Sequence, residues 1–169
     1  MPTTREYGAP PQIKPKRLGD YLEVMSKAVF QAGISWQVVE AKWPSLRDAL
    51  DGFDAERVTA YDDERLDALT QDARVIRSRP KLAAVVHNAN RLVDLDREHK
   101  GFKKYLKSHG DFEATVRALR KEFKYLGDMG AFYFLYVVGE PVPDYEAWKQ
   151  RPEQQKAART RSRGRQPSA

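Results

Sequence analysis

The segment from Pro80 to His99 constrains the fold most, because it is the longest stretch in which apolar residues recur with the period of an α-helix. Its apolar residues would lie on one face of that helix: Leu82, Val85, Val86, Ala89, Leu92 and Val93. Pro80 suits the first turn, where no backbone N–H is needed for an intrahelical bond. The segment therefore predicts a long helix with one apolar face.

Shorter segments with a helical pattern occupy most of the remaining chain. They lie at 17–33, 36–50, 55–61, 64–73, 101–110 and 112–123, and an apolar run follows a glycine-containing turn near residue 127. Pro44 falls inside one of them and could kink it. Few segments alternate with the period of a strand, and Phe132–Val138 is the one that fits either structure. We expect an all-α fold of many short helices, without internal repeats.

The composition divides the chain into three parts: an N-terminal arm at 1–16, a helical domain at 17–150 and a basic tail at 151–169. The arm contains Gly8 and prolines at 2, 10, 11 and 15, which predict an extended segment. The tail is rich in lysine and arginine and holds almost nothing apolar, so we expect it to be disordered. The length of 169 residues is enough for one domain with its own core.

The formal charge of +6 favours a polyanionic partner, nucleic acid first, although much of the excess lies in the tail. The absence of cysteine excludes a disulfide framework, a cysteine-ligated zinc site and a cysteine nucleophile, and the histidines lack metal-ligand spacing. We therefore expect no metal and no cofactor. No stretch is long and apolar enough to cross a membrane, and the polar N-terminus lacks a signal-peptide core, so we expect a cytoplasmic protein.

The sequence FKYLGDMGAFYF predicts two helices joined by a short turn at residues 126–128. This is the pattern of a helix-hairpin-helix, in which glycine allows the backbone to approach a DNA phosphate. The N–H groups of the second helix then point at that phosphate. Lys121 and Lys124 would add positive charge. The alternative is an ordinary interhelical turn, with Asp128 capping the second helix.

The sequence RVIRSRPKL concentrates Arg74, Arg77, Arg79 and Lys81 without an intervening acid. Such a cluster suits a surface that follows a phosphate backbone. The alternative is a solvated start of the long helix, which is the more usual meaning of a run of charges.

Trp36 differs from the other aromatic residues in its position. It follows Gly33, which ends one helical pattern, and Ser35, a candidate N-cap for the next. A flat indole at that point could line a cavity and stack on a base, whereas most of the other aromatic residues are expected in the core.

Asp144 follows the rigid sequence GEPVP and could be held facing a cleft. The alternative is that Asp144 is the N-cap of the helical segment that starts at Tyr145, which is the simpler interpretation.

Four segments together resemble the 3-methyladenine DNA glycosylase I family, the Tag-type branch of the helix-hairpin-helix DNA glycosylases. These are QAGISW, FDAERV, LTQDARVIRSRPKLAAVVHNANRL and FKYLGDMGAFYFLYVVG. The likeness covers 31–92 without a gap and resumes at 123–139, and EYGAP at 6–10 is similar to the EWGVP of the family. The resemblance implies a monomeric, cofactor-free, bacterial-type enzyme, associated with the nucleoid when it binds DNA. It would flip an alkylated purine such as 3-methyladenine out of double-stranded DNA and hydrolyse its N-glycosidic bond.

The resemblance also assigns residues to roles. The base pocket would be formed by Tyr7, Ala28, Gln31, Ala32, Gly33, Ser35 and Trp36, with Trp36 stacking on the base. The DNA backbone would be held by Arg77, Arg79, Lys81, Lys124, Leu126, Gly127 and Gly130. An aspartate beyond the hairpin assists catalysis in the wider superfamily, which makes Asp144 a candidate, and Glu6 and Glu40 are the other acids.

The sequence departs from the family in its base-reading residue, in its zinc ligands, and in the tyrosine and histidine upstream of EWG, which have no counterpart here. Ala28 stands where the family carries the glutamate that reads the methylated base, and the cysteines of the family's structural zinc site are absent. The first departure leaves open a non-catalytic module on the same fold that binds damaged DNA. A third possibility is a small helical interaction protein whose basic tail holds nucleic acid nonspecifically.

Overall fold

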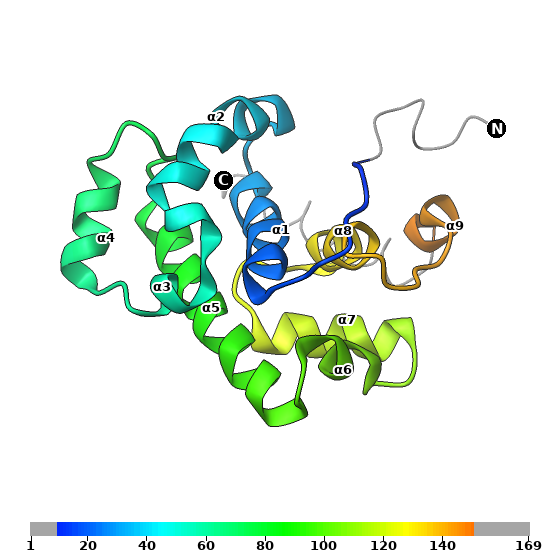
Figure 1. The fold of residues 1–169 in the computed structure, drawn as a ribbon. Coiled ribbons are helices and arrows are strands. Elements are labelled where there is room, and N and C mark those ends of the chain that lie inside the picture. Colours follow the sequence, from blue (N-terminus) through cyan, green and yellow to red (C-terminus); the bar gives the residue numbers. More distant parts are fainter. Residues whose placement is uncertain (1–9, 151–169) are drawn as a thin grey trace, which may run out of the picture.

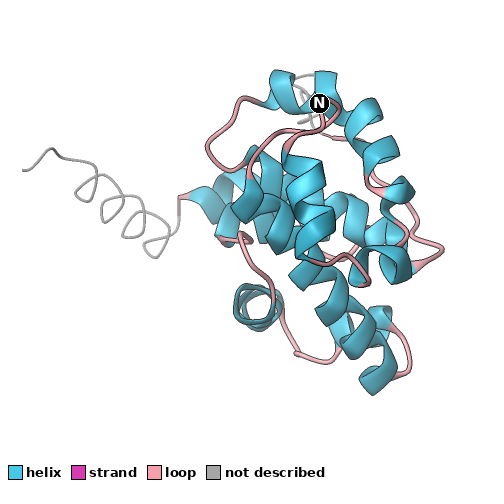
Figure 2. Cartoon of the chain, turned by 90° about the vertical axis from the view of Figure 1, so that its left-hand side faces the viewer, coloured by secondary structure: helices cyan, strands magenta, loops and turns pink. Residues whose placement is uncertain are grey.

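The computed structural model describes residues 10–150, and these residues form helices joined by loops, without a strand (Figure 2). The helices are α1 (Leu18–Gln31), α2 (Trp36–Ala49), the short 3-10 helix η1 (Asp51–Phe53), α3 (Ala55–Thr59), α4 (Asp63–Thr70), α5 (Arg79–His99), α6 (Phe102–Lys107), α7 (Phe112–Glu122), α8 (Asp128–Val137) and α9 (Tyr145–Lys149). The expected all-α fold is confirmed, and the ambiguous run is helical over 132–137, with Val138 as the C-cap of α8. The predicted residues Glu6 and Tyr7, the start of the arm and the basic tail lie outside the described residues.

Helix α1 lies at the centre of the fold, packed against both α5 and α8 (Figure 1). It buries Leu22, Met25, Val29 and Phe30 almost completely. In Figure 1, α2, α3 and α4 lie on one side of α1, and α6, α7 and α9 lie on the other. Two walls of the large cavity described below, α1 and α8, therefore belong to the packed centre of the fold.

Polar N-caps begin several of the helices. Ser35 accepts a hydrogen bond from the N–H of Val38, and Ser78 accepts one from the N–H of Lys81. Side-chain oxygens of this kind satisfy N–H groups that have no partner inside the helix. Helix α2 continues through Pro44, which removes only the bond to the carbonyl of the exposed Glu40.

The described part of the arm runs across the end of α8 without forming a helix (Figure 1). The N–H of Ile13 donates to the carbonyl of Val137 at 2.8 Å, and the side chain of Gln12 donates to the carbonyl of Tyr136 at 2.9 Å. The last carbonyls of a helix lack intrahelical donors, so these bonds both cap α8 and fix the arm.

The turn between α7 and α8 is held by side chains of α5. The buried Asn88 accepts from the N–H of Lys124 at 2.9 Å and donates to its carbonyl at 3.2 Å. Arg91, one turn further along α5, forms an ion pair with Glu122 at 2.6 Å. The turn is therefore fixed by the long helix and not only by its own backbone.

We expect Asn88→Ala to lower the free energy of unfolding by about 1–3 kcal/mol, because the two partly buried backbone groups of Lys124 lose their hydrogen-bond partner. Asn90→Ala is the matched control, since Asn90 lies on the same helix and is exposed, and within residues 10–150 its side chain donates only to the Val86 carbonyl. Chemical denaturation of both variants checks this. Equal effects of the two substitutions would show that Asn88 does not anchor the turn.

Candidate functional site

The candidate site is a cavity of about 590 Å³ between α1, α2, α8 and the arm. Small-molecule sites usually enclose about 300–1,000 Å³, so a single purine would fit. The lining residues are Pro10, Pro11, Ile13, Lys14, Lys16, Asp20, Glu23, Val24, Lys27, Trp36, Glu40, Tyr133 and Val137. The wall thus combines aromatic rings with side chains of both charges.

Trp36 is the most exposed aromatic surface of this wall, with 40% of its surface accessible. Its ring contacts the edge of Tyr133 at a centroid distance of 5.9 Å. By contrast, Trp43 on the same helix is buried and stacks on Phe53. Gly33 has a φ of 80°, so it turns the chain sharply before Ser35 caps α2 and places Trp36 in its first turn.

The candidate acid Glu40 also lines this wall, and among the lining side chains that the sequence did not single out are Glu23, Lys27 and Tyr133. The Glu23 carboxylate accepts from the indole N–H of Trp43 at 2.9 Å and from Arg47 at 3.2 Å. Lys27 donates to Glu40 at 3.1 Å. The sequence signal that could have found Glu23 and Lys27 is their spacing of four residues on α1, which places them on one helix face. Trp36 and Glu40 have the same spacing on α2.

Burial is the main cause that raises the pKa of the Tyr133 hydroxyl above its usual value, and the negative charges of Glu40 and Glu23 add to it. A raised pKa keeps this hydroxyl protonated and neutral at physiological pH. The wall therefore offers a neutral phenol beside two carboxylates, an arrangement that favours a positively charged ligand.

The remaining predicted pocket residues take supporting positions. Ala28 is buried on α1 against Gly130 of α8, and a Cβ atom added at Gly130 would lie 3.5 Å from the Ala28 Cβ. Gln31 is the last residue of α1, and its buried side-chain nitrogen has no hydrogen-bond partner among the described residues. Trp36 is the predicted pocket residue that the structure brings to the cavity wall.

The basic cluster predicted at 74–81 carries less net positive charge in the structure, because nearby aspartates form ion pairs with two of its arginines. Arg79 contacts Asp67 and Asp63 of α4, and Arg74 forms an ion pair with Asp72 at 2.8 Å. Arg77 is exposed, and no ion pair involves it within residues 10–150.

Lys81 points into the protein. Its side chain is buried, and its ammonium donates to the carbonyls of Phe30 and Ala32 at the end of α1. Burial lowers the pKa of this ammonium. Lys81 therefore joins the start of α5 to the end of α1, and its charge is directed at those carbonyls.

The turn between α7 and α8 presents a mixed surface. Lys124 and Gly127 are exposed, whereas the side chain of Leu126 is buried close to Gly130. Asp128 accepts from Arg120 at 2.8 Å. Its charge is thus partly offset where α8 begins.

Asp144 accepts a hydrogen bond from the N–H of Ala147 at 3.0 Å and caps α9, as the simpler interpretation of the sequence expected. It does not line the large cavity. A catalytic role for Asp144 stays a prediction, as does one for Glu6, which lies outside the described residues.

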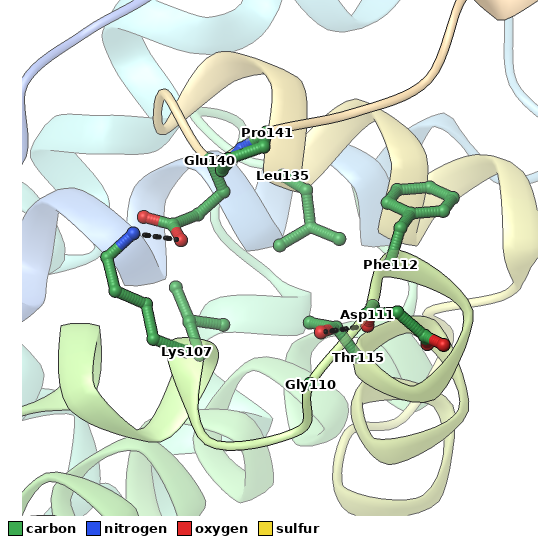
Figure 3. A pocket seen from close by; sticks show the side chains of 9 residues that line it. Lys107, Gly110, Asp111, Phe112, Thr115, Leu135, Glu140 and Pro141 are labelled. Carbon is green, nitrogen blue, oxygen red and sulfur yellow. Dashed lines mark hydrogen bonds and ion pairs between the residues drawn. The ribbon is translucent and has the colours of Figure 1, made fainter.

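A second cavity, of about 180 Å³, lies between α6, α7 and the end of α8 (Figure 3). Lys107 and Glu140 form an ion pair of 3.2 Å across it, and the hydroxyl of Thr115 donates to the carbonyl of Asp111. Because these groups already satisfy one another and the volume is small, we do not assign a ligand to it.

Within residues 10–150 no acidic or histidine cluster could hold a metal ion, and no helix could span a membrane.

A family model described as methyladenine glycosylase matches residues 6–139. DNA-3-methyladenine glycosylase 1 of Escherichia coli is 27% identical over 130 residues, which cover 64% of this chain and 70% of that protein. DNA-3-methyladenine glycosylase of Haemophilus influenzae is 33% identical over 86 residues, covering 51% of this chain and 46% of that protein.

Solved structures share the fold. A structure of 3-methyladenine DNA glycosylase I in complex with 3-methyladenine aligns with a TM-score of 0.65 at 22% identity, covering 78% of this chain and 80% of that chain. The Staphylococcus aureus 3-methyladenine DNA glycosylase I aligns with a TM-score of 0.62 at 24% identity, covering 78% of this chain and 79% of that chain.

We expect Lys81→Met to lower the free energy of unfolding by about 1–2 kcal/mol, because two helix-end carbonyls lose a charged donor. Arg77→Met, which removes an exposed cation two residues before α5, should change it by less than about 0.5 kcal/mol. Thermal and chemical denaturation of both variants measures the difference. A Lys81→Met protein as stable as the wild type would mean that the ammonium contributes nothing to the junction of α1 and α5.

Proposed function

The chain belongs to the methyladenine glycosylase family, and from this we propose that it is a DNA-repair glycosylase that hydrolyses the N-glycosidic bond of alkylated purines such as 3-methyladenine. The family match spans residues 6–139 and so includes the helices that form the large cavity. The observation that carries the proposal is the half-exposed Trp36 on the wall of that cavity. A base flipped out of the duplex would stack there.

The charge of the cavity suits this chemistry. A purine alkylated at a ring nitrogen is positively charged within DNA and leaves as a neutral base when its bond to the sugar breaks. The carboxylates of Glu23 and Glu40 beside Trp36 favour such a cation, and water then attacks the sugar carbon. The enzyme therefore needs to extrude and stack the base, and little acid catalysis is required.

The DNA would lie along the start of α8 and the start of α5. The exposed Gly127 and the N-terminus of α8, which has no side-chain cap, suit a phosphate, and Lys124 is exposed in the same turn. Arg77 supplies an exposed cation before α5. We expect a monomer that binds double-stranded DNA in the cytoplasm.

The direct test is release of free bases from alkylated duplex DNA, with the products identified by mass. Release of 3-methyladenine supports the proposal. Tight binding of the same DNA without any release would favour a damage-recognition module, which Ala28 at the position of the family's glutamate motivates.

We expect Trp36→Ala to lower kcat/KM for base release roughly ten- to a hundredfold, because stacking of a base on an aromatic ring is worth about 1–3 kcal/mol. The fold should persist, since this side chain is partly exposed. Trp36→Phe retains a ring and should keep much of the activity. Unfolding of Trp36→Ala would instead identify Trp36 as a structural residue.

We expect Arg77→Met to reduce the slope of log affinity against log salt by about one unit for any duplex, because one phosphate contact is lost. Lys81→Met should leave this slope unchanged, since its ammonium is already bound inside the protein. Salt titrations of duplex binding by the two variants compare them. An unchanged slope for Arg77→Met would remove the start of α5 from the DNA interface.

A further inference from the structure

The ion pair between Lys27 and Glu40 lies in the wall of the large cavity and joins α1 to α2. The ammonium and carboxylate are 3.1 Å apart, and both side chains are partly exposed. Exposed pairs of this kind contribute little to stability, so the pair can open at small cost. Its position in the cavity suggests a role in binding.

The ammonium of Lys27 also lies over two indole rings. It is 5.9 Å from the centroid of Trp36 and 5.3 Å from that of Trp43. The Lys27 ammonium thus lies above aromatic faces and beside the Glu40 carboxylate. These are the same interactions that would bind a positively charged purine. Lys27 thus places a positive charge where the charge of an alkylated base would be bound.

Of the acids around the cavity, Glu40 is the one whose bonds can be exchanged most simply. Glu23 is held by Trp43 and Arg47, and Asp20 accepts from the backbone N–H groups of Lys16 and Arg17. Within residues 10–150, Lys27 is the only hydrogen-bond or ion-pair partner of Glu40. Release of Lys27 would therefore free this carboxylate completely.

The family's base-reading glutamate has no substitute on the same part of α1. Ala28 occupies that position and packs against Gly130 of α8. Carboxylates reach the cavity instead from Glu23, more than one turn earlier on α1, and from Glu40 on α2.

We propose that Glu40 binds the positive charge of the alkylated base and that Lys27 is a tethered cation that the base displaces from this carboxylate. The inference rests on the proposed function, because it names the residues that read the charge of the base in the same cavity. A neutral purine cannot replace an ammonium beside a carboxylate, so normal bases would leave the ion pair closed. Lys27 thereby contributes selectivity for cationic bases at some cost in affinity.

Two small ligands of nearly the same shape test the proposal on the intact protein. The 3,9-dimethyladeninium ion is a permanent cation in which a methyl group replaces the sugar, and 9-methyladenine is its neutral counterpart. Dissociation constants follow from quenching of tryptophan fluorescence. The wild type should bind the cation more tightly than the neutral base.

Lys27→Met removes the competing charge and keeps the length of the side chain. We expect it to tighten binding of the cation about three- to tenfold and to change binding of the neutral base less than twofold. Glu40→Gln should weaken binding of the cation by about tenfold, again without an effect on the neutral base. Equal changes for the two ligands in either variant would overturn the proposal.

Lys14→Met is the matched control, because Lys14 is exposed, lines the same cavity and contacts neither tryptophan ring. A gain in cation binding as large as that of Lys27→Met would show that only the total charge matters. The double variant Lys27→Met/Glu40→Gln gives a further check. Glu40→Gln should weaken cation binding more in the Lys27→Met background than in the wild type, because Lys27 no longer neutralises Glu40 there. Additive effects would overturn the displacement of Lys27.

Base release from alkylated DNA, measured on the same variants, separates this inference from the proposed function. Release by the wild type with no change of kcat/KM in Lys27→Met or Glu40→Gln would overturn the inference and support the glycosylase activity. Absence of release in every protein, together with the expected preference for the cation, would contradict the activity and support the reading of charge by Glu40.

Discussion

The buried ammonium of Lys81 joins the end of α1 to the start of α5, and the position of Trp36 depends on that junction. Helix α1 ends in carbonyls that lack intrahelical donors, and Lys81 supplies donors to those of Phe30 and Ala32. Immediately beyond them, Gly33 turns the chain with a positive φ and Ser35 starts α2. A rigid end of α1 thus fixes the direction from which the indole enters the cavity.

The cavity balances its charges instead of collecting one sign. Lys14, Lys16 and Lys27 lie among Asp20, Glu23 and Glu40. Two of these acids are held by donors that cannot leave easily, because Trp43 is buried and the backbone N–H groups are part of the chain. The pairing of Lys27 with Glu40 is different in kind, since both partners are long side chains at the surface of the cavity. Glu23 and Asp20 thus keep fixed positions, and the pair of Lys27 and Glu40 is the one that we propose exchanges with a ligand.

The sequence predicted the elements that depend on local chemistry. The periodic segment at 80–99, the N-cap Ser35 and the exposed setting of Trp36 all follow from neighbours in the chain, and they agree with the structure. Interactions between distant segments were not predictable in the same way. Asp63 and Asp67 reach Arg79 only because α4 folds back onto α5. Nothing near Lys81 in the chain indicates that its ammonium donates to carbonyls at the end of α1. Glu40 was a candidate acid from the sequence, but its pairing with Lys27 becomes visible only when α1 and α2 are placed together.

The same reasoning explains how the site tolerates Ala28. The small side chains of Ala28 and Gly130 lie against each other where α1 contacts α8, so this position serves the packing of two helices. Glu40 lies one turn along α2 from Trp36, so α2 sets its backbone position relative to the indole, while Lys27 of α1 holds its carboxylate. In the proposed site, the acid and the stacking ring would therefore lie on one helix, and their separation would not depend on the spacing between α1 and α8. A fold that keeps its helices but relocates its acid can in this way preserve a preference for cationic bases while changing which residues provide it.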